Sequence, residues 1–423
     1  MLRHRDFRFL WLASSSSVIG DYLVTVALAL FVIARTGSAT DLGFVLAAKA
    51  LPLIVFLLIG GVWADRMPRH RVMIATDLVC FTLHGLLAVL IFAGTVPLWQ
   101  IVLIEVAFGS AEAFFRPAAD GLLPQTVPEE DIQQARALTA MSNNIAEFAG
   151  PALATALVLG AGAGWAFALD ALTFLASAGL LTQVRPRRRG AAARAPEQAG
   201  ETLGLWGEIR AGSREVRGRT WVWATLFSFC AALFFGLAPW LVLGPLIARS
   251  QYGHLSVYGI LEATIGLGTI LGAVIGIGWR PRFPLRVAML AITAWPVAAI
   301  LYAAGVTLFV VLPVTLVAGT GIAIFDVLWT TALAERIPPA SLSRVSSYDW
   351  MISGGLLPLG YALAGPLAGA LGPVEVMLAG ACLALVAFAA GLAPRETRML
   401  EQLAPGNTAA RAEEPVLGLV HRH

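Results

Sequence analysis

The sequence predicts an all-α membrane protein with twelve spanning helices in two related halves, and three observations support this. The first is composition, because the 423 residues are 58% hydrophobic and only 13% charged, whereas soluble domains carry about 25% charged residues. The second is that the apolar residues gather in twelve segments of about 20 residues, the length that a helix needs to cross a bilayer. The third is that motifs of the first half return in the second half.

The twelve predicted spans follow one another with short polar or basic stretches between them. The first is too long for a signal peptide and no small-residue cleavage site follows it, so we interpret it as a span. The fifth is interrupted near its start by Asn143, Asn144 and Glu147. The spans cover residues 9–33, 42–63, 72–92, 98–115, 138–159, 165–181, 221–247, 257–277, 287–304, 308–333, 350–370 and 374–392.

The chain divides into two six-helix bundles, residues 1–182 and 221–394, joined by a linker, residues 183–220. The linker is basic and rich in Ala, Gly and Pro, which is typical of a flexible segment, and the tail, residues 395–423, is expected to be disordered. Gly150-Pro151 in the fifth span has a counterpart in Gly365-Pro366 in the eleventh. Such a repeat predicts two halves that rock about a central site.

Arginine placement predicts the orientation in the membrane. Of the arginines near the ends of the spans, only Arg35 and Arg249 lie on the second side, and all the others share the side of the termini. Because cytoplasmic loops carry the excess of positive charge, both termini and the linker are expected in the cytoplasm, with the protein in the cell membrane. The basic side is made of Arg3, Arg5, Arg8, Arg66, Arg69, Arg71, Arg136, the linker arginines, Arg280, Arg282, Arg286, Arg336, Arg344, Arg395 and Arg398.

Several function classes are excluded by the pattern. The net charge of +3 arises from basic clusters between spans, which indicates membrane topology, and we expect no nucleic-acid partner. No Gly-x4-Gly-Lys-Ser/Thr motif is present, so direct use of ATP is not expected. No loop holds a metal-ligand cluster or a nucleophile with a nearby histidine, so we expect neither an enzyme nor a metal or other cofactor.

The loop between the second and third spans carries a recognisable motif. It begins at Gly61, continues through Asp65, Arg66 and Arg69, and ends at Arg71. This loop resembles the signature loop of the major facilitator superfamily, from which it departs at Trp63, Pro68 and His70. The resemblance implies the major facilitator fold, and implies that Gly61, Asp65, Arg66 and Arg69 form a cytoplasmic gate. The alternative is that the arginines only enforce topology.

Further segments resemble one branch of that superfamily, the enterobactin-exporter-like and macrolide-efflux-like group. They include residues 7–11, residues 113–118 and Gly150-Pro151-Ala152. The resemblance implies an exporter that works by a rocker switch, usually as a monomer. Gly150-Pro151 also resembles an antiporter motif, and a plain helix kink at Pro151 is the equal alternative.

Charged side chains inside the spans are the candidate coupling or substrate residues, because they are costly in a membrane. Asp21 and Lys49, the only lysine, are expected close enough to pair, and Glu105 and Glu112 fall with Arg116 on one stripe of the fourth span. Asp326 occupies the position equivalent to Arg116 in the second half, so the two are a candidate gate, and the equal alternative is that each pairs within its own half. Glu147 and Glu262 are further candidates. Asp77 and Asp170 are interpreted as structural, and His84 as a satisfied buried histidine.

The predicted function is therefore a secondary active transporter, a proton-coupled exporter of small amphipathic compounds such as drugs or siderophores. Its expected partners are that substrate, protons and membrane lipids. A facilitator or importer of a metabolite or lipid, and a receptor-like relative that does not transport, are the alternatives.

Overall fold

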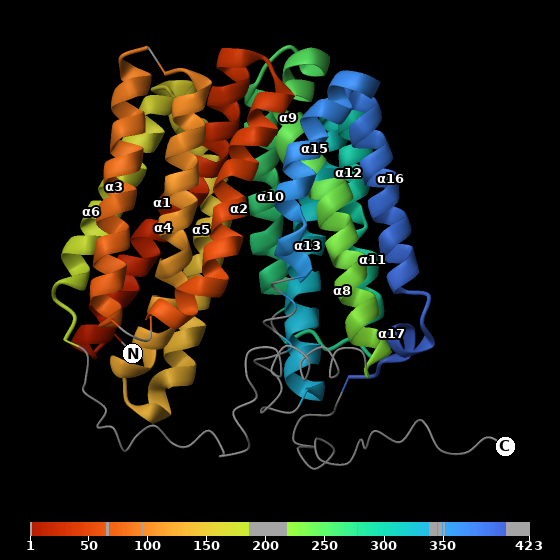
Figure 1. Ribbon diagram of the computed structural model, residues 1–423. Helices are drawn as coiled ribbons and strands as arrows, with labels where there is room; N and C mark the ends of the chain where they lie inside the picture. The colour runs from red at the N-terminus through yellow and green to blue at the C-terminus, as the bar shows by residue number, and fades with distance from the viewer. Residues whose placement is uncertain are drawn as a thin grey trace. The chain divides into compact units, whose positions relative to one another are not determined.

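The computed structural model describes residues 2–64, 67–94, 96–185, 218–276, 278–337, 345, 349 and 352–402. All regular secondary structure in these residues is helical (Figure 1). Most of the predicted linker and tail, together with Asp65 and Arg66, lie outside the described residues.

The first six helices follow the predicted spans closely. The fifth helix, α5, begins six residues earlier than its predicted span because the polar stretch before it is also helical. Short 3-10 turns, η1 and η2, connect α4 to α5. The helices are α1 (Arg5–Thr36), α2 (Ala39–Ala64), α3 (Arg69–Phe92), α4 (Leu98–Leu122), α5 (Ile132–Gly160) and α6 (Ala163–Leu181).

The second set contains two spans that depart from regular α-helix. The seventh consists of α8 (Thr220–Ala232), a π-helical turn η4 (Leu233–Leu237) and α9 (Ala238–Tyr252). The ninth is broken at Thr293, whose hydroxyl donates to the Leu290 carbonyl oxygen. The remaining helices are α10 (Ser256–Gly276), α11 (Pro284–Ile292), α12 (Ala294–Ala303), α13 (Leu308–Arg336), α15 (Leu357–Leu371), α16 (Pro373–Gly391) and the short α17 (Arg395–Met399).

The contacts divide the described chain into two compact units. The first unit contains α1 to α6 together with Pro239–Gly266 and Pro358–Val376. Its packing is dominated by the pairs α2 with α4, α3 with α6, α1 with α6 and α1 with α5. In the second unit, α11 and α12 pack against α13, and its core includes Trp221, Phe325, Trp329 and Phe388.

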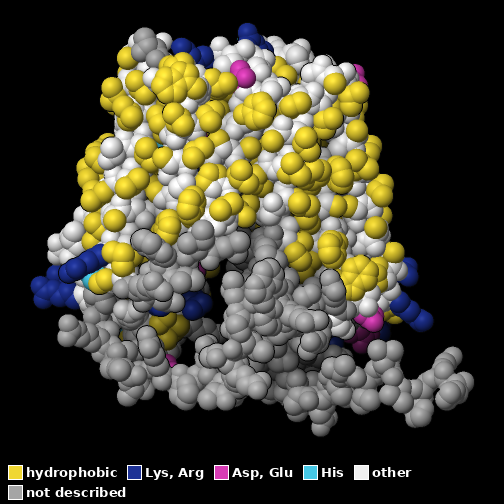
Figure 2. Space-filling view, viewed as in Figure 1, with side chains coloured by type: hydrophobic (Ala, Val, Ile, Leu, Met, Phe, Trp, Pro, Cys, Tyr) yellow, Lys and Arg dark blue, Asp and Glu magenta, His cyan; other side chains and the backbone are white. Residues whose placement is uncertain are grey.

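The outward faces of the helices are apolar. Leu103, Leu172 and Val274 are each more than half exposed, and Figure 2 shows hydrophobic side chains covering the viewed face between basic side chains at its two ends. In water such a surface would aggregate, whereas lipid is a good solvent for it. Eleven segments among the described residues are long and apolar enough to cross a membrane, and α5 is the twelfth of the predicted set. The protein is a multi-pass helical membrane protein.

Candidate functional site

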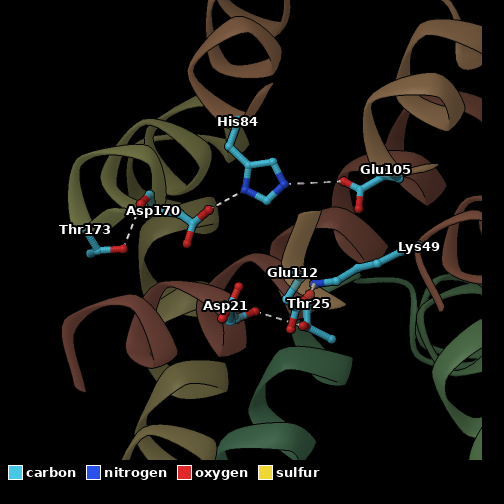
Figure 3. A network of polar contacts seen from close by, with 8 residues as sticks. All are labelled: Asp21, Thr25, Lys49, His84, Glu105, Glu112, Asp170 and Thr173. Carbon is cyan, nitrogen blue, oxygen red and sulfur yellow. Dashed lines mark hydrogen bonds and ion pairs between the residues drawn. The ribbon is translucent and has the colours of Figure 1, made fainter. Parts of the chain in front are cut away.

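Six ionisable side chains from five helices meet inside the first unit. They come from α1, α2, α3, α4 and α6, and Figure 3 shows them as one network. Burial of so many charged groups in a membrane protein is expensive and therefore usually functional. The members are Asp21, Lys49, His84, Glu105, Glu112 and Asp170, which we call the polar network.

One end of the polar network is fully buried and is centred on a histidine. The Nδ1 atom of His84 forms a hydrogen bond with Oδ2 of Asp170, and its Nε2 atom lies 3.8 Å from Oε1 of Glu105. All three side chains are 0% exposed. The imidazole therefore lies between two carboxyl groups that come from different helices (Figure 3).

The other end of the polar network is partly exposed. The Lys49 ammonium lies 3.6 Å from Oε2 of Glu112, and the two side chains are 18% and 13% exposed. This ion pair is longer than a hydrogen bond. Asp21 interacts electrostatically with both Glu112 and Lys49. Asp21 and Lys49 therefore lie near each other, as predicted. The ion-pair partner of Lys49, however, is Glu112.

Small residues allow the helices to approach closely around the polar network. A Cβ atom on Gly109 would lie 2.0 Å from the carbonyl oxygen of Lys49, so only glycine permits α2 and α4 to touch here. A Cβ atom on Gly20 would lie 2.2 Å from Oδ1 of Asp170, which places α1 directly against the acid of α6. Close packing of this kind is common where small residues meet between membrane helices.

Aromatic rings surround the histidine. The Phe108 ring stacks on the imidazole with 3.9 Å between centroids, and the rings of Phe167 and Phe174 meet it edge-on. The Lys49 ammonium also lies over the Phe108 ring, 4.6 Å from its centroid. Phe108 therefore touches both ends of the polar network, and the apolar rings keep the histidine end dry.

Several buried polar atoms lack a hydrogen bond from the described residues. They include both carboxyl oxygens of Glu105, Nε2 of His84, Oδ1 of Asp21 and Oε2 of Glu112. Buried polar groups in native proteins are nearly always hydrogen-bonded, and an exception calls for an explanation. Protons at these positions would supply the missing donors.

The structure places the other two predicted acids in separate surroundings. Glu262 on α10 accepts a hydrogen bond of 2.6 Å from Nε1 of Trp240 and a second from Tyr258. Glu147 on α5 is exposed and hydrogen-bonded to Tyr22. Glu262 is thus held by two neighbours of its own, which is the arrangement of a structural buried acid.

The predicted gating residues are described in part. Arg69 donates to the carbonyl oxygen of Gly121, so it satisfies an acceptor in the last turn of α4. Gly61 lies within α2, whereas Asp65 and Arg66 lie outside the described residues. Arg116 and Asp326 are both exposed, on α4 and α13.

The antiporter-like pair lies in a continuous helix. Gly150 is buried against Tyr22 of α1, and Pro151 follows it inside α5, which extends from Ile132 to Gly160. The gating and kink roles remain predictions.

Sequence reasoning undervalued His84 and Asp170, which it interpreted as a satisfied histidine and a structural acid. Their depth was a usable signal. His84 lies eight residues before the end of α3 at Phe92, Glu105 seven residues after Leu98, and Asp170 seven residues after Ala163. Helix α3 ends on the side of the membrane where α4 and α6 begin. With a helical rise of about 1.5 Å per residue, the three side chains therefore lie at about the same depth from that side.

The arrangement is suited to holding and moving protons. A histidine offers one N–H donor and one lone pair when neutral, and two donors when protonated. Placed between two carboxyl groups, it can exchange a proton with either. Among the described residues, no group of His, Cys, Asp and Glu side chains has the geometry of a metal site.

Comparison with known proteins identifies the kind of molecule that carries this site. A family model described as transmembrane secretion effector matches residues 1–419. Macrolide efflux protein A of Streptococcus pyogenes is 23% identical over 373 residues, which cover 86% of this chain and 90% of that protein. The putative bacilysin exporter BacE of Bacillus subtilis is 25% identical over 275 residues, 64% of this chain and 66% of that protein.

Solved structures show the same fold. A bacterial homologue of the human lysosomal transporter Spinster, in an inward-facing and unoccupied conformation, has a TM-score of 0.71 at 17% identity, covering 95% of this chain and 99% of its own. The nucleoside transporter NupG has a TM-score of 0.67 at 17% identity, covering 92% and 98% of the two chains. These structures confirm the predicted helical membrane fold, and the predicted count of twelve spans is roughly consistent with the described helices. The division into bundles of residues 1–182 and 221–394 stays a prediction.

Proposed function

Because the chain belongs to the transmembrane secretion effector family of the major facilitator superfamily, we propose that this transporter is a proton-coupled exporter of small amphipathic compounds. It would work in the cytoplasmic membrane with both termini in the cytoplasm, as the arginine distribution predicts. It would act as a monomer, with substrate, protons and lipids as its partners.

The polar network is the observation that carries this proposal. A facilitator needs no titratable groups at membrane depth, whereas a proton-driven carrier needs at least one that can be loaded and unloaded. Here Asp21, Glu105, Glu112 and Asp170 lie close together, with Lys49 and His84 as the basic members of the polar network. The excess of acids leaves room for protons, and the partly exposed end with Lys49 and Glu112 is where protons would enter the network from water.

The relatives support the direction and class of transport. Proteins named for macrolide efflux and for bacilysin export are similar over most of the chain and about two thirds of it, respectively. Both names describe movement of a compound out of a cell. Alternating access of the two halves, with Asp65, Arg66 and Arg69 as a cytoplasmic gate, would release the compound on the far side. The pair of Arg116 and Asp326 would assist that gate.

The test uses everted membrane vesicles from cells that lack their own major efflux pumps. A labelled macrolide, alongside a panel of amphipathic dyes, is added outside while respiration acidifies the interior. We expect accumulation that depends on the transporter and collapses when an uncoupler dissipates the proton gradient. Accumulation of a compound that persists without the gradient would indicate a facilitator instead. No flux of any panel member in either direction would favour a receptor-like protein.

Two substitutions test the proton sites within the same assay. Asp21→Asn and Glu105→Gln each preserve side-chain shape while removing the ability to lose a proton. We expect both to abolish gradient-driven accumulation while expression stays normal. Unchanged accumulation in both variants would contradict the proposal that these acids carry the coupling proton. Glu262→Gln is the matched control, because Glu262 is a buried acid with its own hydrogen-bond donors.

A further inference from the structure

We propose that His84 is a proton-transfer residue that moves the coupling proton between Glu105 and Asp170. This inference rests on the proposed proton coupling and specifies which groups store the proton. It also gives a role to two side chains, His84 and Asp170, that the sequence indicated to be structural.

The His84 imidazole has a carboxyl group next to each of its two ring nitrogens. On one side, Nδ1 is hydrogen-bonded to Oδ2 of Asp170, so that contact is already formed. On the other side, Nε2 lies 3.8 Å from Oε1 of Glu105, about 1 Å beyond hydrogen-bond length. A small rotation of the imidazole or of the Glu105 carboxyl would close the second contact. The three side chains come from α3, α4 and α6, so a relative shift of these helices would open or close it.

Unmet hydrogen bonds at the second contact separate it from an ordinary buried ion pair. Both carboxyl oxygens of Glu105 and Nε2 of His84 are buried and without a hydrogen bond from the described residues. A static structural triad would be expected to satisfy these groups, because a buried polar group without a hydrogen bond destabilises the fold. One proton placed between Glu105 and His84 supplies the missing donor.

The proton balance of the transfer is simple. With Nδ1 protonated and bonded to the Asp170 carboxylate, Nε2 presents its lone pair to a protonated Glu105. The O–H bond of Glu105 breaks as an Nε2–H bond forms, and the Nδ1–H bond breaks as an O–H bond forms on Asp170. The imidazole is neutral before and after, and one proton has moved from Glu105 to Asp170. Transfer in the opposite direction returns the proton to Glu105 and restores the original tautomer of His84.

The surroundings keep this store separate from bulk water and connect it to the exposed end of the network. Phe108, Phe167 and Phe174 enclose the imidazole, and His84, Glu105 and Asp170 are fully buried. Glu112, seven residues farther along α4 and 13% exposed, is the carboxyl group through which a proton would enter. The other charged groups that act on His84, Glu105 and Asp170 from the packed helices are Asp21 on α1, Lys49 on α2 and Glu112 on α4.

Infrared titration of the full-length protein in lipid nanodiscs tests the store without any substrate. Difference spectra across a pH series report the carbonyl stretch of protonated carboxylic acids. We expect Glu105→Gln and Asp170→Asn each to remove part of one common titrating band, and His84→Gln to shift its midpoint, because the three groups share a proton. A band whose midpoint is the same in wild type and in His84→Gln would overturn the proposal.

Transport measurements then separate a relay from a structural role. An exporter that cannot transfer its proton still exchanges labelled for unlabelled macrolide across a vesicle membrane without a gradient. We expect His84→Gln to retain exchange while gradient-driven accumulation falls to the level of vesicles that lack the protein. Equal loss of exchange and accumulation in all three variants, with an unshifted infrared band, would make the triad structural.

A matched control lies about two turns away in α3. Asp77 is a buried acid that accepts a hydrogen bond of 2.6 Å from the Ser177 hydroxyl, and Asp77→Asn keeps a partner for that hydroxyl. We expect this variant to keep both the common infrared band and gradient-driven accumulation. If wild-type vesicles show no gradient-driven transport at all, the proposed function fails by itself, and the infrared titration still decides whether His84 shares a proton.

Discussion

The ion pair between Lys49 and Glu112 lies at the boundary between the dry and the accessible parts of the polar network. Its 3.6 Å separation and partial exposure indicate a contact that can be broken during a transport cycle. Removing one partner leaves the other charge with less compensation, and that is costly in a low-dielectric site. Lys49 has a second favourable contact with the Phe108 ring, which helps to hold the ammonium in place.

A double-mutant cycle measures how strongly the two residues are coupled. We expect Lys49→Met and Glu112→Gln each to lower the free energy of unfolding in mixed micelles, and the double variant to lose less than their sum. The expected coupling energy is about 1–3 kcal/mol, because the two residues are in direct contact. Losses that add to within about 0.5 kcal/mol would show that the pair contributes nothing beyond its separate members.

At the scale of the helix, backbone contact between α2 and α4 positions the site. The carbonyl oxygen of Lys49 occupies the space that a Cβ atom on Gly109 would need. The close approach of these two helices therefore requires that residue 109 has no side chain. That contact brings Lys49 next to the Glu112 face of α4. Helix association in membranes relies on such packing because apolar burial from water contributes little there.

Substitution of Gly109 by alanine tests this contact. We expect Gly109→Ala to lower stability by about 1–3 kcal/mol, because backbone atoms of α2 cannot rotate away from the added methyl group. Thermal unfolding of the purified protein in detergent provides the measurement. Gly179→Ala in α6 is the control, because no heavy atom lies within 4 Å of its Cβ position. The control is expected to raise stability by about 0.5–1 kcal/mol through helix propensity. A Gly109→Ala variant as stable as the control would contradict the proposed contact.

At the scale of the whole molecule, arginine placement predicts which face meets the cytoplasm. The two exposed residues Thr36 and Met67 report on opposite faces, because one ends α1 and the other precedes α3. The native cysteines, of which Cys80 and Cys230 are buried and Cys382 is exposed, are first replaced by serine.

Labelling of intact cells with a membrane-impermeant maleimide tests the orientation. In the cysteine-free background we expect Thr36→Cys to react from outside and Met67→Cys to react only after the cells are opened. The expectation follows from the excess of arginine on the side of Met67. The reverse pattern would place the termini outside and would overturn the proposed direction of transport.

The sequence by itself determined the number and approximate ends of the spans, the membrane class and the superfamily. These features depend on local properties, since the length of an apolar run and the side on which arginines gather are read directly along the chain. It also selected Asp21, Lys49, Glu105 and Glu112, because any charge inside an apolar run is conspicuous. The structure brings these four together with His84 and Asp170.

Only the tertiary structure decided which charges are partners. The proximity of His84 to both Asp170 and Glu105 depends on the rotation and lateral packing of α3, α4 and α6, and residues on these helices are up to 86 positions apart. Periodicity within one helix cannot determine which of its faces meets a given neighbour. The same reason explains why Lys49 is paired with Glu112 rather than with Asp21. The depth of a residue in the membrane follows from its position along its helix. Which side chains of different helices contact one another depends on how those helices pack.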